Sequence, residues 1–199
     1  MKIFLSILII IFSFQSWTKA NDSIRDFQIE GMSIGDSLLD YFTNEEINNK
    51  KNSYNDKGYI YPERDYYSLT FYNTNFENYE AVQINLKDGD NRYIIHSLSG
   101  IKNMNIEECY KVFDSIEKEI DALFSNSRKV DKQKRKHVYD KTGKSFTTDV
   151  YYWLPDNSYA ALVCTDWSEN IEVSKNWADH MRTEMGSPSF TKWYQNLNF

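Results

Sequence analysis

The side chains best suited to acid–base or metal chemistry are few in this chain and stand far apart. The histidines His96, His137 and His180 occupy three separate segments, and none has the spacing of a metal-binding array. On a strand, His180 and Glu184 would share one face, but a cluster of polar surface residues explains that pair more simply. We therefore predict no catalytic residue, no cofactor and no metal. Enzymatic activity stays open, and its absence is favoured.

Short motifs of other chemistries are also missing. No GxSxG sequence is present to place a nucleophilic serine on a strand-to-helix turn. The segment Asp88-Gly89-Asp90-Asn91 lacks the rest of a calcium-binding loop and is typical of a hairpin turn. The glycines of Gly31-Met32-Ser33-Ile34-Gly35 lack the Lys and Ser/Thr that end a phosphate-binding loop.

The two cysteines form the first candidate pair. Cys109 falls on the apolar stripe of a helix expected over residues 106–124, and Cys164 shares a strand face with Ala160 and Leu162. An even pair of cysteines in an exported protein is typically oxidised, so we predict a Cys109–Cys164 disulfide between helix and sheet. Two buried free thiols are the alternative.

A basic run and a group of aromatic residues together give a candidate binding surface. Exposed aromatic rings and cationic side chains are common in recognition surfaces. The alternatives are that residues 126–136 are a solvated connection, and that the aromatic residues belong to a sheet covered on both faces. The surface comprises Tyr151, Trp153, Arg128, Lys129, Lys132, Lys134, Arg135 and Lys136.

The first twenty residues have the pattern of a secretory signal peptide. Lys2 precedes an apolar run from Ile3 to Phe14, and small residues stand at the −3 and −1 positions of a cut after Ala20. This run is shorter than the roughly 20 residues that a membrane-spanning helix needs. We therefore expect a signal peptide over residues 1–20, no stable membrane anchor after cleavage, and a periplasmic or secreted protein.

Composition favours a folded, acidic protein. The formal net charge of −6 opposes binding to phosphate backbones, so nucleic acid is not an expected partner. With 41% hydrophobic and 16% aromatic residues, the chain is too apolar to be disordered. We predict one globular domain over residues 21–199.

The order of hydrophobic patterns indicates an α+β fold. Strands joined by short turns predict an antiparallel sheet, with the helix over residues 106–124 packed across it and short helices near both ends. The layout of helix followed by strands occurs twice, so two tandem helix–sheet units are an open alternative. Strands are expected over residues 67–73, 79–87, 92–98, 136–140, 146–154, 158–168 and 177–185.

Two resemblances accompany this layout. Gly31-Met32-Ser33, followed by two short helices and a hairpin sheet, resembles the helix–helix–sheet envelope domains of β-lactamase inhibitor proteins and of a small outer-membrane assembly lipoprotein. The chain is rich in Asn, Ile, Lys, Tyr and Phe, which is the bias that AT-rich genomes produce in proteins. With this bias, the segment Tyr93 to Ile101 resembles uncharacterised exported proteins of AT-rich marine bacteria. Neither resemblance implies an activity.

These observations favour a non-catalytic exported module that binds or interacts with a protein, a peptide or a glycan. Recognition needs rigid aromatic area and a charged rim, both of which this chain has. Two alternatives stay open: a hydrolytic enzyme whose site residues are dispersed in the sequence, and a structural component of the envelope.

Overall fold

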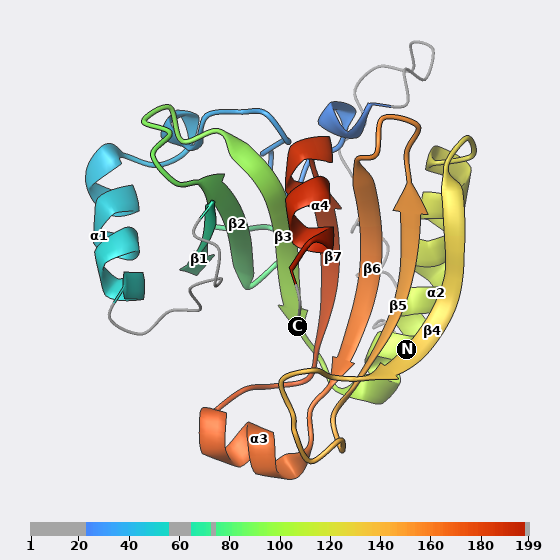
Figure 1. Ribbon diagram of the computed structural model, residues 1–199. Helices are drawn as coiled ribbons and strands as arrows, with labels where there is room; N and C mark the ends of the chain where they lie inside the picture. The colour runs from blue at the N-terminus through green and yellow to red at the C-terminus, as the bar shows by residue number, and fades with distance from the viewer. Residues whose placement is uncertain (1–22, 56–64, 73–74, 198–199) are drawn as a thin grey trace, which may run out of the picture.

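The structure is a computed structural model that describes residues 23–55, 65–72 and 75–197. The predicted signal peptide lies outside these residues. Seven strands of the described chain form one antiparallel sheet in the order β1-β2-β3-β7-β6-β5-β4 (Figure 1). The predicted α+β class with an antiparallel sheet is confirmed.

The strands agree with the expected ones except around the basic run. Residues 126–136 were expected to be a connection, but most of them form the edge strand β4, and the expected strand over residues 136–140 is largely a turn. The run was misinterpreted because an edge strand can carry charged side chains along its length. Those side chains face either water or acidic partners on a neighbouring element. The strands are β1 Tyr66–Tyr72, β2 Ala81–Lys87, β3 Ile95–Asn103, β4 Arg128–Lys136, β5 Phe146–Trp153, β6 Tyr159–Asp166 and β7 His180–Gly186.

Side chains cap the N-termini of several helices. The Glu108 amide donates to Asn105 Oδ1 at 2.9 Å, and the Phe190 amide donates to Ser187 Oγ at 3.2 Å. Ser37 Oγ accepts from the Leu39 amide at 3.2 Å at the start of η2, and the short helix α3 was not expected. The helices are η1 Ile24–Asp26, η2 Leu38–Asp40, α1 Asn44–Asn55, α2 Ile106–Leu123, α3 Glu169–Lys175 and α4 Pro188–Gln195.

Helix α2 covers one face of the sheet. Its apolar stripe buries Cys109, Phe113 and Ile120 against β6 and β7. The predicted disulfide is present: Cys109 is bonded to Cys164 of β6, and their Cα atoms are 6.0 Å apart. The bond crosses from helix to sheet inside the main core.

The opposite face is covered only in part, by α4 (Figure 1). A smaller core lies under this helix, where Phe190 and Trp193 pack with Tyr66 and Tyr159. The rest of this face is open enough to leave a hollow. No helix in the described ranges is long and apolar enough to cross a membrane.

The two helix-then-strand halves meet where β3 pairs with β7. Helix α1 contacts β1 at one edge of the sheet, whereas α2 lies across β6 and β7 (Figure 1). The halves therefore share an order of elements but pack their helices differently.

Candidate functional site

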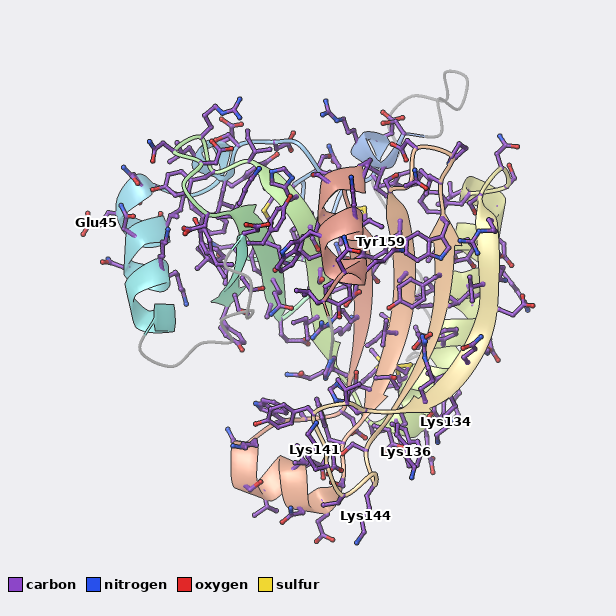
Figure 2. All side chains as sticks on the ribbon, in the orientation of Figure 1. Glu45, Lys134, Lys136, Lys141, Lys144 and Tyr159 are labelled. Carbon is purple, nitrogen blue, oxygen red and sulfur yellow. A yellow bond between two sulfur atoms is a disulfide. The ribbon has the colours of Figure 1, made fainter. Side chains whose placement is uncertain are left out.

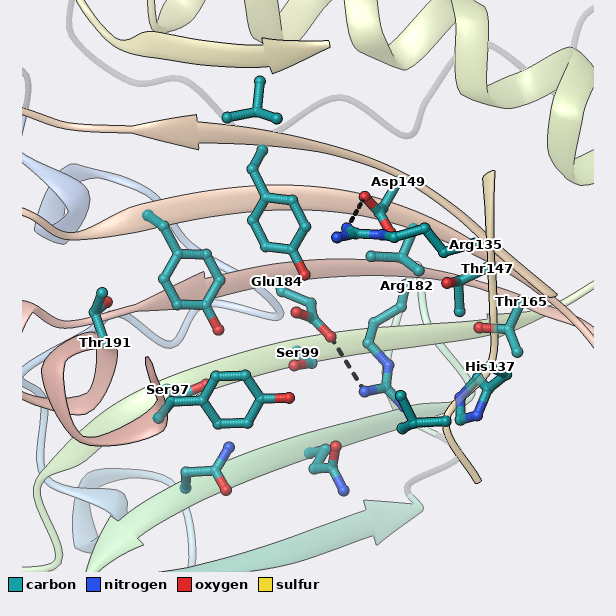
Figure 3. Close-up of a pocket in the computed structure, with 18 of the residues that line it drawn as sticks. Ser97, Ser99, Arg135, His137, Thr147, Asp149, Thr165, Arg182, Glu184 and Thr191 are labelled. Carbon is teal, nitrogen blue, oxygen red and sulfur yellow. Dashed lines mark hydrogen bonds and ion pairs between the residues drawn. The ribbon is translucent and has the colours of Figure 1, made fainter. Parts of the chain in front are cut away.

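A hollow of about 640 Å³ opens on the sheet face opposite α2, beside α4. Strands β2 to β7 and helix α4 all contribute to its lining, so residues far apart in the sequence meet there (Figure 3). Its size is within the usual range for ligand pockets. Hydroxyl and amide side chains that line it are Gln83, Asn85, Ser97, Ser99, Thr147 and Thr165.

Strand alternation decides which side chains enter the hollow. Along β7, His180, Arg182 and Glu184 line it, whereas Met181 and Met185 belong to the core beneath α2. The sequence had placed His180 and Glu184 on one face, and they do share it. They are not a surface cluster, however, because His180 is only 8% exposed.

Two ion pairs cross the hollow. Arg182 Nη1 donates to Glu184 Oε1 at 3.1 Å, and Arg135 Nη2 donates to Asp149 Oδ1 (Figure 3). Each guanidinium therefore has a carboxylate beside it. None of these four charged side chains is therefore left without an oppositely charged partner in the hollow.

Three buried polar atoms of residues that line the hollow lack a hydrogen-bond partner within the described ranges: His180 Nε2, Arg182 Nε and Thr191 Oγ1. The first two stand together on β7. His180 Nδ1 is 3.0 Å from the carbonyl oxygen of Ala178, which can only accept, so Nδ1 carries the hydrogen. Burial, with the nearby Arg182 cation, lowers the pKa of His180 to about 4. The ring is therefore neutral near pH 7, and its Nε2 is a free acceptor.

His137 stands at the same end of the hollow. Its Nδ1 accepts from the Tyr139 amide at 3.1 Å, and its ring lies 4.2 Å from the Trp167 ring, measured between centroids. Burial and the Arg182 charge lower the pKa of His137. With Nδ1 accepting, the neutral ring carries its hydrogen on Nε2.

The turn that carries His137 is held by a buried carboxylate. Asp140 accepts hydrogen bonds from the amides and hydroxyls of Thr142 and Ser145 and from the Ser168 hydroxyl, at 2.7 to 3.1 Å. These bonds keep the pKa of Asp140 well below its usual range. They tie the β4–β5 turn to the start of α3, which fixes one rim of the hollow.

Aromatic rings form another wall. Tyr151 and Trp153 are nearly parallel with centroids 6.0 Å apart, and Tyr159 lies 5.9 and 5.6 Å from them. Burial raises the pKa of both Tyr151 and Tyr159. Tyr151 and Trp153 were expected to be solvent-exposed, but both are half-buried because each packs against Tyr159.

The hollow continues beyond Trp153 into a second depression. Trp153, Thr191 and Gln195 line both, and Arg128 and Lys192 line the far part. Arg128 lies over the Trp153 ring at 5.9 Å. The combined lining therefore runs along most of β5, about 20 Å at the rise of an extended strand.

The structure divides the predicted basic surface between two faces. Lys129 pairs with Glu117 and Asp121 of α2, at 2.8 and 2.7 Å, and Lys132 pairs with Asp114. Arg135 and Lys136 line the hollow instead.

The two other basic residues of that surface also differ in position. Lys134 is 3.8 Å from Asp166 Oδ2 and 5.8 Å from the Tyr110 ring of α2, whereas Arg128 lines the second depression. Figure 2 shows Lys134 and Lys136 at the lower end of β4, near Lys141 and Lys144 of the following turn. The basic run is therefore no single patch, because its side chains divide between the two faces of the sheet, with an irregular register between Val130 and Gln133.

One serine–histidine contact lies outside the hollow. His96 Nδ1 is 3.2 Å from Ser189 Oγ and 3.4 Å from Ser187 Oγ, at the start of α4. Among the described residues, no hydrogen bond joins a carboxylate to His96, and His96 and Ser189 line neither depression. Within the same ranges, no three His, Cys, Asp or Glu side chains gather as metal ligands would.

Comparisons with models of protein families, with curated proteins and with solved structures give no match. The site is therefore interpreted from its own geometry. Sequence reasoning did not select Arg182, Asp149 or His137, which stand on strand or turn segments without a motif. Alternation along β5 and β7 is the signal that could have grouped Arg182 with His180, and Asp149 with Tyr151.

Proposed function

We propose that this protein is an exported, non-catalytic module that binds a short glycan in the hollow and its extension past Trp153. The observation that carries the proposal is the joint presence of a half-buried aromatic wall and a floor of hydroxyl, amide and paired ionic groups. Ligand pockets combine apolar area with a few well-placed polar groups in this way.

A sugar chain suits this lining on two grounds. The C–H faces of a sugar ring can lie on aromatic rings, whose faces carry partial negative charge. Sugar hydroxyls both donate and accept, which matches hydroxyl side chains such as Ser97, Ser99, Thr147 and Thr165.

A peptide suits the hollow less well. Extended peptides gain affinity from main-chain hydrogen bonds to a free sheet edge. The strands under the hollow, β3, β7, β6 and β5, each pair with a neighbour on both sides. Their backbone groups are thus committed to the sheet, and a peptide would meet side chains alone.

Export is supported by the N-terminal sequence pattern and by the Cys109–Cys164 disulfide, since disulfides persist in oxidising compartments. We expect the mature protein to begin at Asn21. Mass spectrometry of the protein from its host measures this, and an intact Met1 in a membrane fraction would contradict it.

The glycan proposal is tested by titrating the mature protein with defined neutral oligosaccharides and following tryptophan fluorescence and calorimetric heat. We expect at least one tetrasaccharide to bind, and Trp153→Ala to weaken it at least tenfold. Tyr72→Ala is the matched control, because Tyr72 is an exposed aromatic residue that lines neither depression. Equal losses in both variants, or no binding by any sugar, would reject the proposal.

Hydrolysis is the second candidate, because His137, His180 and Glu184 converge in one hollow. Against it, both histidines have lowered pKa values, whereas a general base works best with a pKa near the operating pH. Glu184 and Asp149 are each engaged by an arginine. Cleavage of a bound oligosaccharide during prolonged incubation would favour the enzyme over the binding module.

A further inference from the structure

We propose that His180 and Arg182 form a subsite for an uncharged hydroxyl group of the ligand. In this subsite the ligand hydroxyl donates a hydrogen bond to His180 Nε2 and accepts one from the Nε–H of Arg182. This deepens the proposed function, on which it rests, by naming which part of a sugar the lower end of the hollow recognises. The two atoms are the buried polar atoms of β7 that lack a partner among the described residues.

The hydrogen-bonding roles of the two atoms follow from their other contacts. The bond from His180 Nδ1 to the Ala178 carbonyl oxygen leaves Nε2 of the neutral ring as an acceptor. Arg182 uses Nη1 for Glu184 Oε1, and its Nε–H can only donate. The subsite therefore presents one acceptor and one donor, two residues apart on the same face of β7.

That combination selects against charged groups. A carboxylate or phosphate can only accept, so it would meet the lone pair of His180 Nε2 and the neighbouring Glu184 carboxylate. An ammonium group can only donate, so it would face the Arg182 guanidinium. A hydroxyl group does both, and either one hydroxyl or two adjacent ones on a sugar ring satisfies the pair.

Because the two atoms are buried, leaving them without hydrogen bonds costs free energy, and a ligand with the wrong hydrogen-bonding groups does not remove that cost. His180 is 8% exposed, and an unsatisfied buried polar atom lowers stability until a partner reaches it. The neighbouring side chains on β6 across from His180 and Arg182 are Thr165 and Val163, neither of which supplies a bond to the two atoms. Both atoms are enclosed by protein in this structure, so the side chains around them must move before a ligand hydroxyl supplies the two bonds.

The test compares His180→Phe with His96→Phe, using neutral and acidic tetrasaccharides as probes. Phenylalanine keeps the size of the ring and removes the acceptor, and His96 is a half-buried histidine outside both depressions. The probe is the neutral tetrasaccharide that the unaltered protein binds most tightly. We expect His180→Phe to lower the affinity for this sugar about fivefold to tenfold, and His96→Phe to leave it unchanged. Far-UV circular dichroism and thermal unfolding verify that both variants fold.

A second measurement uses the unaltered protein, in case His180→Phe fails to fold. The ¹⁵N shifts of the His180 ring should show a hydrogen on Nδ1, and the Nε2 signal should move when the neutral sugar binds. A deoxy sugar lacking the bound hydroxyl should bind His180→Phe and the unaltered protein equally.

The outcomes separate the two proposals. If neutral sugar binds and Trp153→Ala weakens it, but His180→Phe has no effect or the ring hydrogen is on Nε2, the subsite is wrong and the glycan function stands. Tighter binding of the acidic probe tetragalacturonate than of the neutral tetrasaccharide would likewise overturn the subsite. If no sugar binds, or a peptide library yields the ligand, both proposals fail.

Discussion

The two faces of the sheet differ in how their polar and apolar groups are arranged. The face beneath α2 is closed: Val150, Tyr152, Leu162 and Cys164 are all buried there. The opposite face carries the neighbours of these residues in the sequence, and it combines aromatic rings, ion pairs and unpartnered polar atoms. One set of strands therefore supports a core on one side and a site on the other.

The difference has an energetic meaning. Complete burial of apolar side chains is the main stabilising contribution in a domain of this size. Unpartnered polar atoms such as His180 Nε2 oppose folding slightly and are more readily explained by a ligand. Substitutions on the closed face should thus change stability most, and substitutions in the hollow should change binding most.

The largest effect on stability is expected from removing the disulfide. Replacing Cys109 and Cys164 by alanine opens a loop of 55 residues and should lower the free energy of unfolding by about 4 kcal/mol on the chain-entropy model. Chemical denaturation of the variant beside the unaltered protein measures it. A loss below 1 kcal/mol would mean that the closed face does not depend on this link.

Adjacent residues of β5 allow a matched comparison of the faces. Tyr152 is 1% exposed and donates its hydroxyl to Asp121 Oδ1 of α2 at 2.7 Å, so Tyr152→Ala should cost about 3 to 4 kcal/mol. Trp153 is half-buried on the opposite side, so Trp153→Ala should cost about half as much and leave a folded protein. If Trp153→Ala unfolds the protein, the aromatic wall is core and the proposed binding face is wrong.

Between pH 4 and pH 6.5, stability should depend on pH through buried histidines, whereas carboxylates with lowered pKa values, such as Asp121 on α2, act at lower pH. The pKa of His180 falls from 6.5 in the unfolded chain to about 4 in the folded protein. Between these values the unfolded chain binds more protons, so acidification from pH 6.5 to 4 should remove up to about 3 kcal/mol. Above pH 6.5 this residue contributes no pH dependence.

The measurement is a series of unfolding curves between pH 4 and pH 8. His180→Phe should show a shallower decline below pH 6.5 than the unaltered protein, because one titrating group is gone. His96→Phe is the comparison: it also removes a histidine whose pKa is lowered by burial, but it keeps His180, so the decline assigned to His180 should remain. Parallel declines in the unaltered protein and His180→Phe would contradict the assignment.

Much of the closed face could be predicted from the sequence because its patterns are local. The apolar spacing of α2 and the strand pattern of β6 placed Cys109 and Cys164 on faces that a helix-to-sheet disulfide can join. The strand β4 was missed because its lysines look like a solvated loop. Their partners, Asp114, Glu117 and Asp121, lie on α2, and only the fold brings them near.

The hollow was predicted less well because its residues gather from six strands and a helix. Tyr151 and Trp153 were selected for their aromatic character, and they do line it. His180 was noticed, but its burial depends on how α3 and the β4–β5 turn close that end, which no local pattern contains. Arg135 was selected as part of the basic run, but its pairing with Asp149 was missed, since that carboxylate belongs to another strand.

The smallest effect on stability is expected at Lys132 of β4, whose side chain points to the face opposite that of Arg135. Lys132 pairs with Asp114 of α2 on the surface, so Lys132→Gln should change the free energy of unfolding by less than about 1 kcal/mol and leave sugar affinity unchanged. Arg135→Gln leaves the buried Asp149 carboxylate without its cation inside the hollow. We expect a larger loss of stability than with Lys132→Gln, because a buried carboxylate loses its partner, together with a loss of several-fold in affinity, measured by calorimetry with the same tetrasaccharide. Equal affinities in the two variants would show that the basic strand contributes to the closed face alone.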